Sequence, residues 1–157
     1  MCSPVDSRRT RRPTVGAATG AVAGLATITP AAGYVQPVAA IAVGLAAGVV
    51  CYLAVGLKDR FGYDDSLDVV GVHMVGGVLG VLLTGVFASL AINAAGAATS
   101  PGQLGKQAVL AGVTVAFSFV ATLAILKVTD MTVGVCVSHE DEEAGLDTSQ
   151  QGEGYRI

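Results

Sequence analysis

The stretch Pro37–Leu57 reads PVAAIAVGLAAGVVCYLAVGL and contains no charged side chain. A helix of about 20 apolar residues is long enough to cross the roughly 30 Å hydrocarbon core of a lipid bilayer. Three further apolar stretches lie at about 14–35, 66–93 and 107–128. A single segment of this kind also occurs as a buried helix of soluble proteins, but four within 157 residues indicate a membrane protein. We therefore predict an all-α fold, a polytopic membrane helix bundle of four transmembrane helices.

The composition agrees with a lipid environment. Hydrophobic residues make up 52% of the chain, charged residues only 13%, and the mean hydropathy is +0.65. A soluble domain usually carries about a quarter charged residues. The sequence has no Ser/His/Asp set, no cluster of metal ligands and no nucleotide-binding glycine motif. We therefore expect neither an enzyme, nor a cofactor or metal, nor nucleic-acid binding.

Charged residues divide the chain into three parts. A basic segment at 1–12 precedes the transmembrane region at 13–129, and an acidic, solvated tail follows at 130–157. Lys and Arg are enriched on the cytoplasmic side of membrane proteins. Here they lie before the first span, between the second and third spans and at the end of the fourth, while the other two loops hold one Lys between them. We predict a multi-pass protein of the plasma membrane with both termini in the cytoplasm.

Small residues recur at a spacing of four within the spans. Such rows let helix backbones approach closely, and in lipid this packing takes the place of the hydrophobic drive. The pattern predicts tight packing, within the chain or against helices that the chain does not contain. The three rows are Gly16, Gly20 and Gly24, then Gly44 and Gly48, then Gly76 and Gly80.

One titratable side chain, His73, lies about two helical turns inside the third apolar stretch. On a regular helix it shares a face with small and apolar residues, which are Val69, Val70, Gly76, Gly77, Gly80 and Thr84. Polar groups within membrane spans are rare and costly, so each is a candidate for function. The alternative is a histidine that serves packing alone. We favour function, and His73 is the first candidate for contact with a substrate.

Three further polar residues are candidates. Asp65 and Asp68 lie at the predicted cytoplasmic mouth of the span that contains His73, with the spacing of N-cap and N3. They either cap the helix at its positive dipole end or form a vestibule that attracts cations. Asp68 is about 140° round the helix from His73, which favours a contact with a neighbouring helix. Thr29-Pro30 interrupts the first span, either as a simple kink or as a polar site formed by freed carbonyls and the Thr29 hydroxyl.

Three stretches carry a resemblance to a known family. Gly20–Gly33 reads GAVAGLATITPAAG and Gly62–Gly77 reads GYDDSLDVVGVHMVGG. Both closely resemble the ammonium transporter (Amt/Mep/Rh) family and look like its eighth and tenth spans. The tail GLDTSQQGEGY at Gly145–Tyr155 resembles the family's cytoplasmic end. The likeness covers the chain from about Pro13 onward and indicates a C-terminal portion of the fold, without the first seven spans.

The resemblance implies a trimeric, eleven-span transporter of ammonium, ammonia or methylammonium with a hydrophobic pore lined by two facing histidines. His73 matches the second histidine, Thr29 a polar residue near the outer recruitment site, and Val69 an apolar pore position. A PII-type regulatory protein is the partner that the resemblance implies at the cytoplasmic surface. The tail departs from the family at Gln150 and Gln151, which stand where Glu and His are expected.

We therefore expect ammonium or ammonia transport, with this chain forming part of a conduction pore in the lipid bilayer. Completion of the pore requires a homo-oligomer or association with a separate N-terminal half. Two alternatives stay open. One is a truncated fragment without transport, and the other is an assembly or regulatory subunit that packs with full-length transporter protomers.

The distribution of Lys and Arg predicts the accessibility of the three cysteines. Cys2 and Cys136 face the cytoplasm in a four-span topology with both ends inside, and Cys51 is shielded within the second span. A membrane-impermeant maleimide should therefore label none of them in intact cells, and should label Cys2 and Cys136 after permeabilisation. Strong labelling of Cys136 before permeabilisation contradicts this topology.

Overall fold

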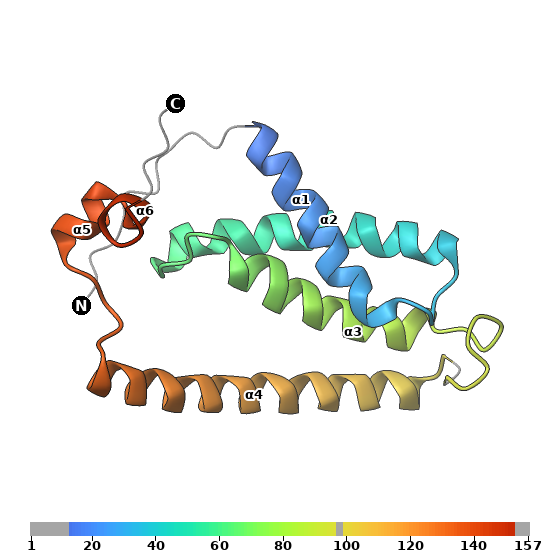
Figure 1. The fold of residues 1–157 in the computed structure, drawn as a ribbon. Helices are drawn as coiled ribbons and strands as arrows, with labels where there is room; N and C mark the ends of the chain where they lie inside the picture. The colour runs from blue at the N-terminus through green and yellow to red at the C-terminus, as the bar shows by residue number, and fades with distance from the viewer. Residues whose placement is uncertain (1–12, 97–98, 153–157) are drawn as a thin grey trace. The chain divides into compact units, whose positions relative to one another are not determined.

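The computed structural model describes residues 13–96 and 99–152, and all regular elements in these residues are helices (Figure 1). The prediction of an all-α fold is confirmed. The described residues contain one isolated antiparallel bridge, between Val35 and Ala88. The basic segment predicted at 1–12 lies outside the described residues. In chain order the helices are α1 (Pro13–Ile28), η1 (Thr29–Ala31), α2 (Pro37–Phe61), η2 (Val70–Met74), α3 (Val75–Phe87), α4 (Pro101–Thr132), α5 (His139–Ala144) and α6 (Leu146–Ser149).

Three stretches of helix are long and apolar enough to cross a membrane. They are Pro37–Phe61, Val70–Phe87 and Pro101–Thr132, and they correspond to the second, third and fourth predicted spans. The first predicted span, 14–35, corresponds to a shorter apolar helix at Val15–Ala31. Length and composition therefore support three spans and one shorter apolar helix among the described residues.

The helix ends differ from the predicted ones where caps fix them. α2 runs to Phe61, because Gly62 adopts a left-handed conformation (φ +66°) and its N–H donates to the Lys58 carbonyl at 2.8 Å. α4 begins at Pro101, earlier than the predicted start near 107. Proline suits the first turn of a helix, and the Ser100 hydroxyl accepts a hydrogen bond from the Gln103 N–H at 3.0 Å.

The chain divides within α4 into two compact units, and the larger one contains α1, η1, α2, η2 and α3. Its core consists of small side chains, which include Ala23, Cys51, Val55 and Val72. Cys51 is 2% exposed, as predicted for the second span. Small side chains allow these helices to pack with their backbones close together.

Only the third of the predicted glycine rows packs against another helix of the described chain. A β-carbon on Gly80 would overlap the carbonyl oxygen of Thr27 in α1, and one on Gly76 would lie 2.8 Å from the Thr27 hydroxyl oxygen. Thr27 is fully buried, and its hydroxyl donates to the Ala23 carbonyl at 2.8 Å. By contrast, positions 16, 20, 24, 44 and 48 have no such neighbour within 4 Å. These two rows leave open surface on α1 and α2.

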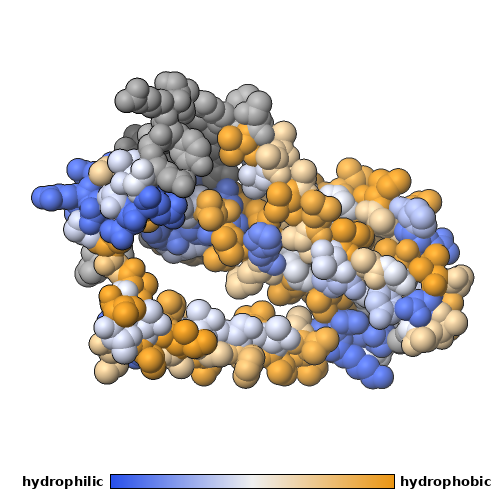
Figure 2. All heavy atoms as spheres, in the orientation of Figure 1, coloured by the Kyte–Doolittle hydropathy of each residue, from blue (hydrophilic) through white to orange (hydrophobic). Residues whose placement is uncertain are grey.

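Apolar side chains also cover much of the outer surface of the helices (Figure 2). α4 is the extreme case, because none of its residues is buried. Exposed apolar helix surface of this length is unfavourable in water and is normal in a bilayer, where lipid surrounds it. This arrangement agrees with a membrane protein.

The smaller unit contains the acidic tail. In it Ser138 caps α5, since its hydroxyl accepts a hydrogen bond from the Asp141 N–H at 3.1 Å. His139 lies 3.5 Å from Glu143 one turn later, and both side chains are largely exposed. Gly145, at φ +89°, separates α5 from α6. The tail therefore presents charged side chains to solvent.

The contact between α1 and α3 predicts different outcomes for two glycine substitutions. Gly80→Ala should destabilise the fold by about 1–3 kcal/mol, because the added methyl group overlaps the Thr27 carbonyl. Gly48→Ala, in α2, meets open space and should leave stability unchanged or slightly raised. Reversible unfolding in mixed micelles measures both. Equal stability of the two variants would show that the α1–α3 approach is looser than described.

Candidate functional site

The residues predicted to contact substrate lie on two parts of the larger unit. Val69 directly precedes η2 and His73 lies within it. Thr29 begins η1, beside Pro30, whose ring lies 3.2 Å from the position of a β-carbon on Gly80. Gly80 follows His73 by about two helical turns. The structure thus places Val69 and His73 one helical turn apart. Thr29, in the first apolar stretch, lies beside a different part of the third stretch, near Gly80.

Thr29 uses its hydroxyl within its own helix. The hydroxyl donates to the Leu25 carbonyl, one turn earlier, at 2.7 Å. Pro30, which has no N–H, ends α1 there and the chain continues as the 3-10 turn η1. The regular α-helix therefore ends at this motif, and the Thr29 side chain is exposed.

His73 lies in a π-helical turn, which the sequence pattern did not indicate. η2 covers Val70–Met74, and the Val75 N–H donates to the Val70 carbonyl five residues earlier. Such wide turns are rare and often occur at functional sites. The His73 side chain is exposed, as are its neighbours Val69 (47%) and Met74 (49%).

The predicted helical face of His73 was partly wrong. A regular α-helix places His73 about 60° from Gly76, on the side of Gly80 and Thr84. Gly76, Gly80 and Thr84 are buried, whereas His73 is exposed. The physical reason is the wider turn of η2, which changes the angle per residue and rotates His73 away from the packed face. Gly71 and Val72 point inward in its place and are buried.

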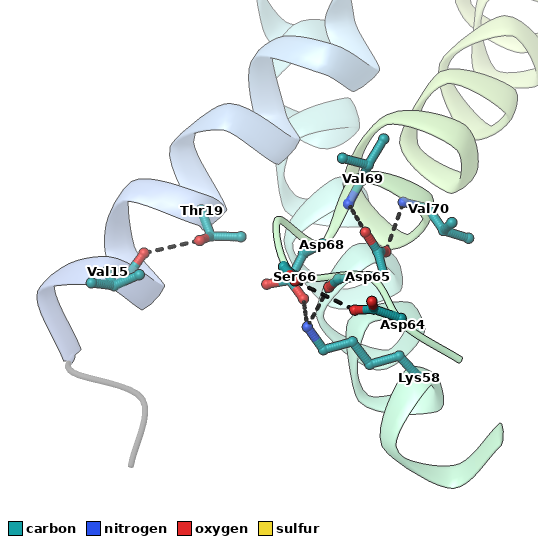
Figure 3. A network of polar contacts seen from close by, with 9 residues as sticks. All are labelled: Val15, Thr19, Lys58, Asp64, Asp65, Ser66, Asp68, Val69 and Val70. Carbon is teal, nitrogen blue, oxygen red and sulfur yellow. Dashed lines mark hydrogen bonds and ion pairs between the residues drawn. The ribbon is translucent and has the colours of Figure 1, made fainter. Parts of the chain in front are cut away.

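Asp65 makes the capping contacts that were one of its two predicted roles. Its carboxylate accepts hydrogen bonds from the N–H groups of Val69 at 2.7 Å and Val70 at 2.9 Å (Figure 3). These are among the N–H groups that a helix start leaves without an intrahelical partner. A carboxylate there also interacts favourably with the helix dipole. Asp65 therefore fixes the beginning of the helix that carries His73.

Asp68 contacts a neighbouring helix, as its angle to His73 suggested. Its carboxylate forms an ion pair with the ammonium group of Lys58, in the last turn of α2 (Figure 3). Lys58 also donates to the Asp65 carbonyl at 2.8 Å. The two charged side chains are only 15% and 14% exposed, so both are largely removed from solvent.

The backbone of Asp68 is strained. It is the one residue other than glycine with a positive φ (57°) among the described residues. The left-handed conformation costs such residues about 1–3 kcal/mol, although Asp tolerates it better than most. From this conformation the Asp68 carbonyl accepts a hydrogen bond from the Val72 N–H at 2.9 Å. The strained residue is thus hydrogen-bonded through its carbonyl to Val72, the residue before His73.

The sequence did not indicate two structural features here, the contacts of Lys58 and the π-helical turn. In the sequence, Lys58 indicates only the orientation of the spans. The single signal in the sequence is the position of two basic residues and four carboxylates between two apolar stretches. Sequence periodicity does not show which carboxylate forms the ion pair with Lys58, because the conformation of the loop at 62–69 determines which one is close to it.

Comparison with known proteins identifies the family. The model of the Ammonium Transporter Family matches residues 1–155. The ammonium transporter of Bacillus subtilis is 42% identical over 149 residues, which are 91% of this chain and 37% of that protein. For the ammonium transporter of Mycobacterium tuberculosis the identity is 45% over 154 residues, 90% and 32% of the two chains. Ammonium transporter Amt1 of Archaeoglobus fulgidus is 40% identical over 141 residues, 88% and 36%. The chain spans about a third of the length of these curated relatives.

The capping contacts predict a local effect of Asp65. Asp65→Ala should destabilise the start of the third apolar helix by about 0.5–2 kcal/mol, since the Val69 and Val70 N–H groups lose their acceptor. Hydrogen exchange at residues 69–74 should accelerate. Asp64→Ala is the matched control, because among the described residues the Asp64 carboxylate accepts a hydrogen bond only from the Ser66 hydroxyl, at 3.4 Å, and does not cap the helix. Unchanged exchange in Asp65→Ala would show that the cap does not hold η2.

Proposed function

Because the chain belongs to the ammonium transporter family, a family of transporters rather than enzymes, we propose that it contributes to the passage of ammonium or ammonia across a lipid bilayer. His73 is the side chain that meets the substrate, and methylammonium is a further substrate. Val69 lines the same path, Thr29 lies near its outer end, and Asp65 and Asp68 lie at its cytoplasmic mouth. No cofactor takes part.

The observation that carries this proposal is the environment of His73. Its imidazole is exposed on an apolar stretch of helix between Val69 and Met74, and no hydrogen bond joins it to the other described residues. A neutral imidazole has one N–H donor and one acceptor nitrogen. The acceptor nitrogen can take a hydrogen bond or a proton from ammonium as the cation loses its water.

The charges of the described spans favour passage of a neutral molecule. Asp65 and Asp68 stand at the helix start, and each is already engaged, one in a cap and the other in an ion pair. A bare cation in a dry apolar path has a high energy unless countercharges accompany it. A substrate that leaves its proton before it passes avoids this cost. Ammonia meets that condition, and His73 is the group placed to handle the proton.

The proposed assembly needs helices beyond those described here. The chain covers about a third of its curated relatives, and we propose that it corresponds to their C-terminal part, with four spans and both termini in the cytoplasm. The exposed α4 and the open glycine rows of α1 and α2 supply surface for further helices. A homo-oligomer or a separate N-terminal half completes the pore. The acidic cytoplasmic tail is the surface for a PII-type regulatory protein.

One alternative function has specific support. A non-transporting fragment, or an assembly or regulatory subunit that packs with full-length protomers, needs apolar surface but no complete pore. The unburied surface of α4 fits such a subunit equally well. The role of His73 separates the alternatives, since a packing subunit does not use its imidazole.

The proposal predicts that His73→Ala lowers transport without loss of folded protein. The chain is coexpressed with the N-terminal part of a related transporter, and uptake of labelled methylammonium into reconstituted vesicles is normalised to folded protein. Loss of the imidazole should lower the rate or the selectivity at least tenfold, which corresponds to about 1.4 kcal/mol or more of lost stabilisation. His139→Ala, in the exposed tail, should leave both unchanged. Unchanged normalised transport in His73→Ala would assign His73 to packing and favour the alternative.

A further inference from the structure

We propose that Gly71 is a positioning residue for His73. Its contact with α2 requires the wide turn η2, and that turn directs the imidazole away from the packed helices. The value of this direction for transport rests on the proposed function. The direction itself is a property of the fold, and it is measured without a transport assay.

Gly71 lies against the backbone of α2. A β-carbon on Gly71 would lie 2.6 Å from Cγ2 of Val55, 2.9 Å from the Val55 backbone nitrogen and 3.0 Å from its Cα. The nitrogen and the Cα belong to the backbone, which cannot rotate away as the end of a side chain can. Gly71 and Val55 are both buried. Position 71 therefore has room for a glycine only, because η2 approaches α2 so closely.

A second contact with α2 follows one turn further along. A β-carbon on Gly76 would lie 3.2 Å from Sγ of Cys51, which is buried in α2. Cys51 and Val55 are four residues apart in the sequence, whereas Gly71 and Gly76 are five apart. Five residues of the third apolar stretch therefore correspond to four residues of α2.

A regular α-helix cannot place both glycines against α2. Residues four apart lie about 40° from each other round an α-helix, and residues five apart lie about 140° from each other. The turn η2 removes this difference. Its hydrogen bond runs from the Val75 N–H to the Val70 carbonyl five residues earlier, so the turn holds one extra residue. The contacts of Gly71 and Gly76 thus account for a kind of turn that is otherwise rare.

The extra residue also determines the direction of His73. In a regular α-helix His73 would lie about 60° from Gly76, where Thr27 and Cys51 already pack beside the helix. With η2 in place, Gly71 and Val72 are buried and His73 is exposed. The contact of Gly71 with α2 is therefore coupled to the exposure of the imidazole.

Deletion of Met74 tests this relation. The Met74 side chain is 49% exposed, and its deletion leaves Gly71 and Gly76 four residues apart, as Cys51 and Val55 are. A regular α-helix then places both glycines against α2. His73 still follows Gly71 by two residues, about 200° round the helix, on the side away from α2.

The Met74 deletion should therefore fold in lipid nanodiscs with unchanged thermal stability. Diethylpyrocarbonate, a small uncharged reagent, modifies accessible histidines, and mass spectrometry follows both histidines of the chain. The rate at His73 relative to His139, which is exposed in α5, should also be unchanged. Deletion of Leu82, half-buried in the regular part of α3, is the matched control. It turns Gly85 away from Leu104 by about 100° and should lower the yield of folded protein severalfold.

A substitution at Gly71 tests the contact itself. In Gly71→Ala the added methyl group overlaps the backbone of α2, so η2 has to move and its hydrogen bond from Val75 is lost. Hydrogen exchange at the Val75 N–H should accelerate severalfold while exchange at 79–84 stays unchanged, whereas a general loss of stability accelerates both. The relative modification rate of His73 should also change severalfold. Gly77→Ala is the control and should change neither, since nothing lies within 4 Å of a β-carbon there.

Two results overturn the proposal. One is Gly71→Ala with unchanged exchange at Val75 and unchanged modification of His73. The other is a Met74 deletion that fails to fold, as the Leu82 deletion does, or that buries His73. If Gly71→Ala does not fold, the deletion carries the test.

Failure of this proposal is distinguishable from failure of the proposed function. If His73→Ala transports normally while the Met74 deletion behaves as expected, Gly71 positions a side chain that the substrate does not need. If His73→Ala abolishes transport while the Met74 deletion fails to fold, His73 acts in transport but the role of Gly71 is wrong.

Discussion

The close approach of Thr27 to Gly80 is the constraint on which the larger helical unit depends. The two backbones are in contact there, so that a side chain on Gly80 would overlap the Thr27 carbonyl. In lipid the contact of small residues replaces the hydrophobic drive that holds a soluble core together. Thr27 donates its hydroxyl to its own helix, so the buried contact leaves no polar group of that side chain unsatisfied. The position of α3 against α1, and thereby which face of η2 turns inward, follows from this crossing.

A second constraint acts at the start of the helical segment formed by η2 and α3. Among the described residues, Lys58, Asp65 and Asp68 contact one another where α2 ends and η2 begins. Each serves a need that lipid and packing cannot meet, since a helix start has N–H groups without acceptors and a buried carboxylate requires a counterion. Packing and capping together fix both ends of the segment.

These features connect the fold to the proposed transport. Apolar side chains along a path cannot form hydrogen bonds with a cation. A single neutral imidazole adds one hydrogen-bond donor and one acceptor to that path. Its usefulness depends on direction, because the same ring turned toward Gly76 and Gly80 would only fill space. In the wide turn of η2, hydrogen bonds to the carbonyl five residues earlier replace the regular α-helical ones, and the ring of His73 is exposed. The strain at Asp68 is consistent with a site where local stability is lower in exchange for geometry.

The sequence by itself determined the fold class and the apolar stretches and made His73 the first candidate for function, because hydrophobic length and a lone polar residue in a span are local properties. It also showed that Asp65 stands at a helix start. Only the tertiary structure decided that Gly76 and Gly80 pack while Gly44 and Gly48 do not, that Lys58 meets Asp68, and that η2 rotates His73 off the glycine face. These depend on contacts between helices and on a loop whose shape no periodicity records. A regular α-helical wheel cannot describe a turn with a different number of residues.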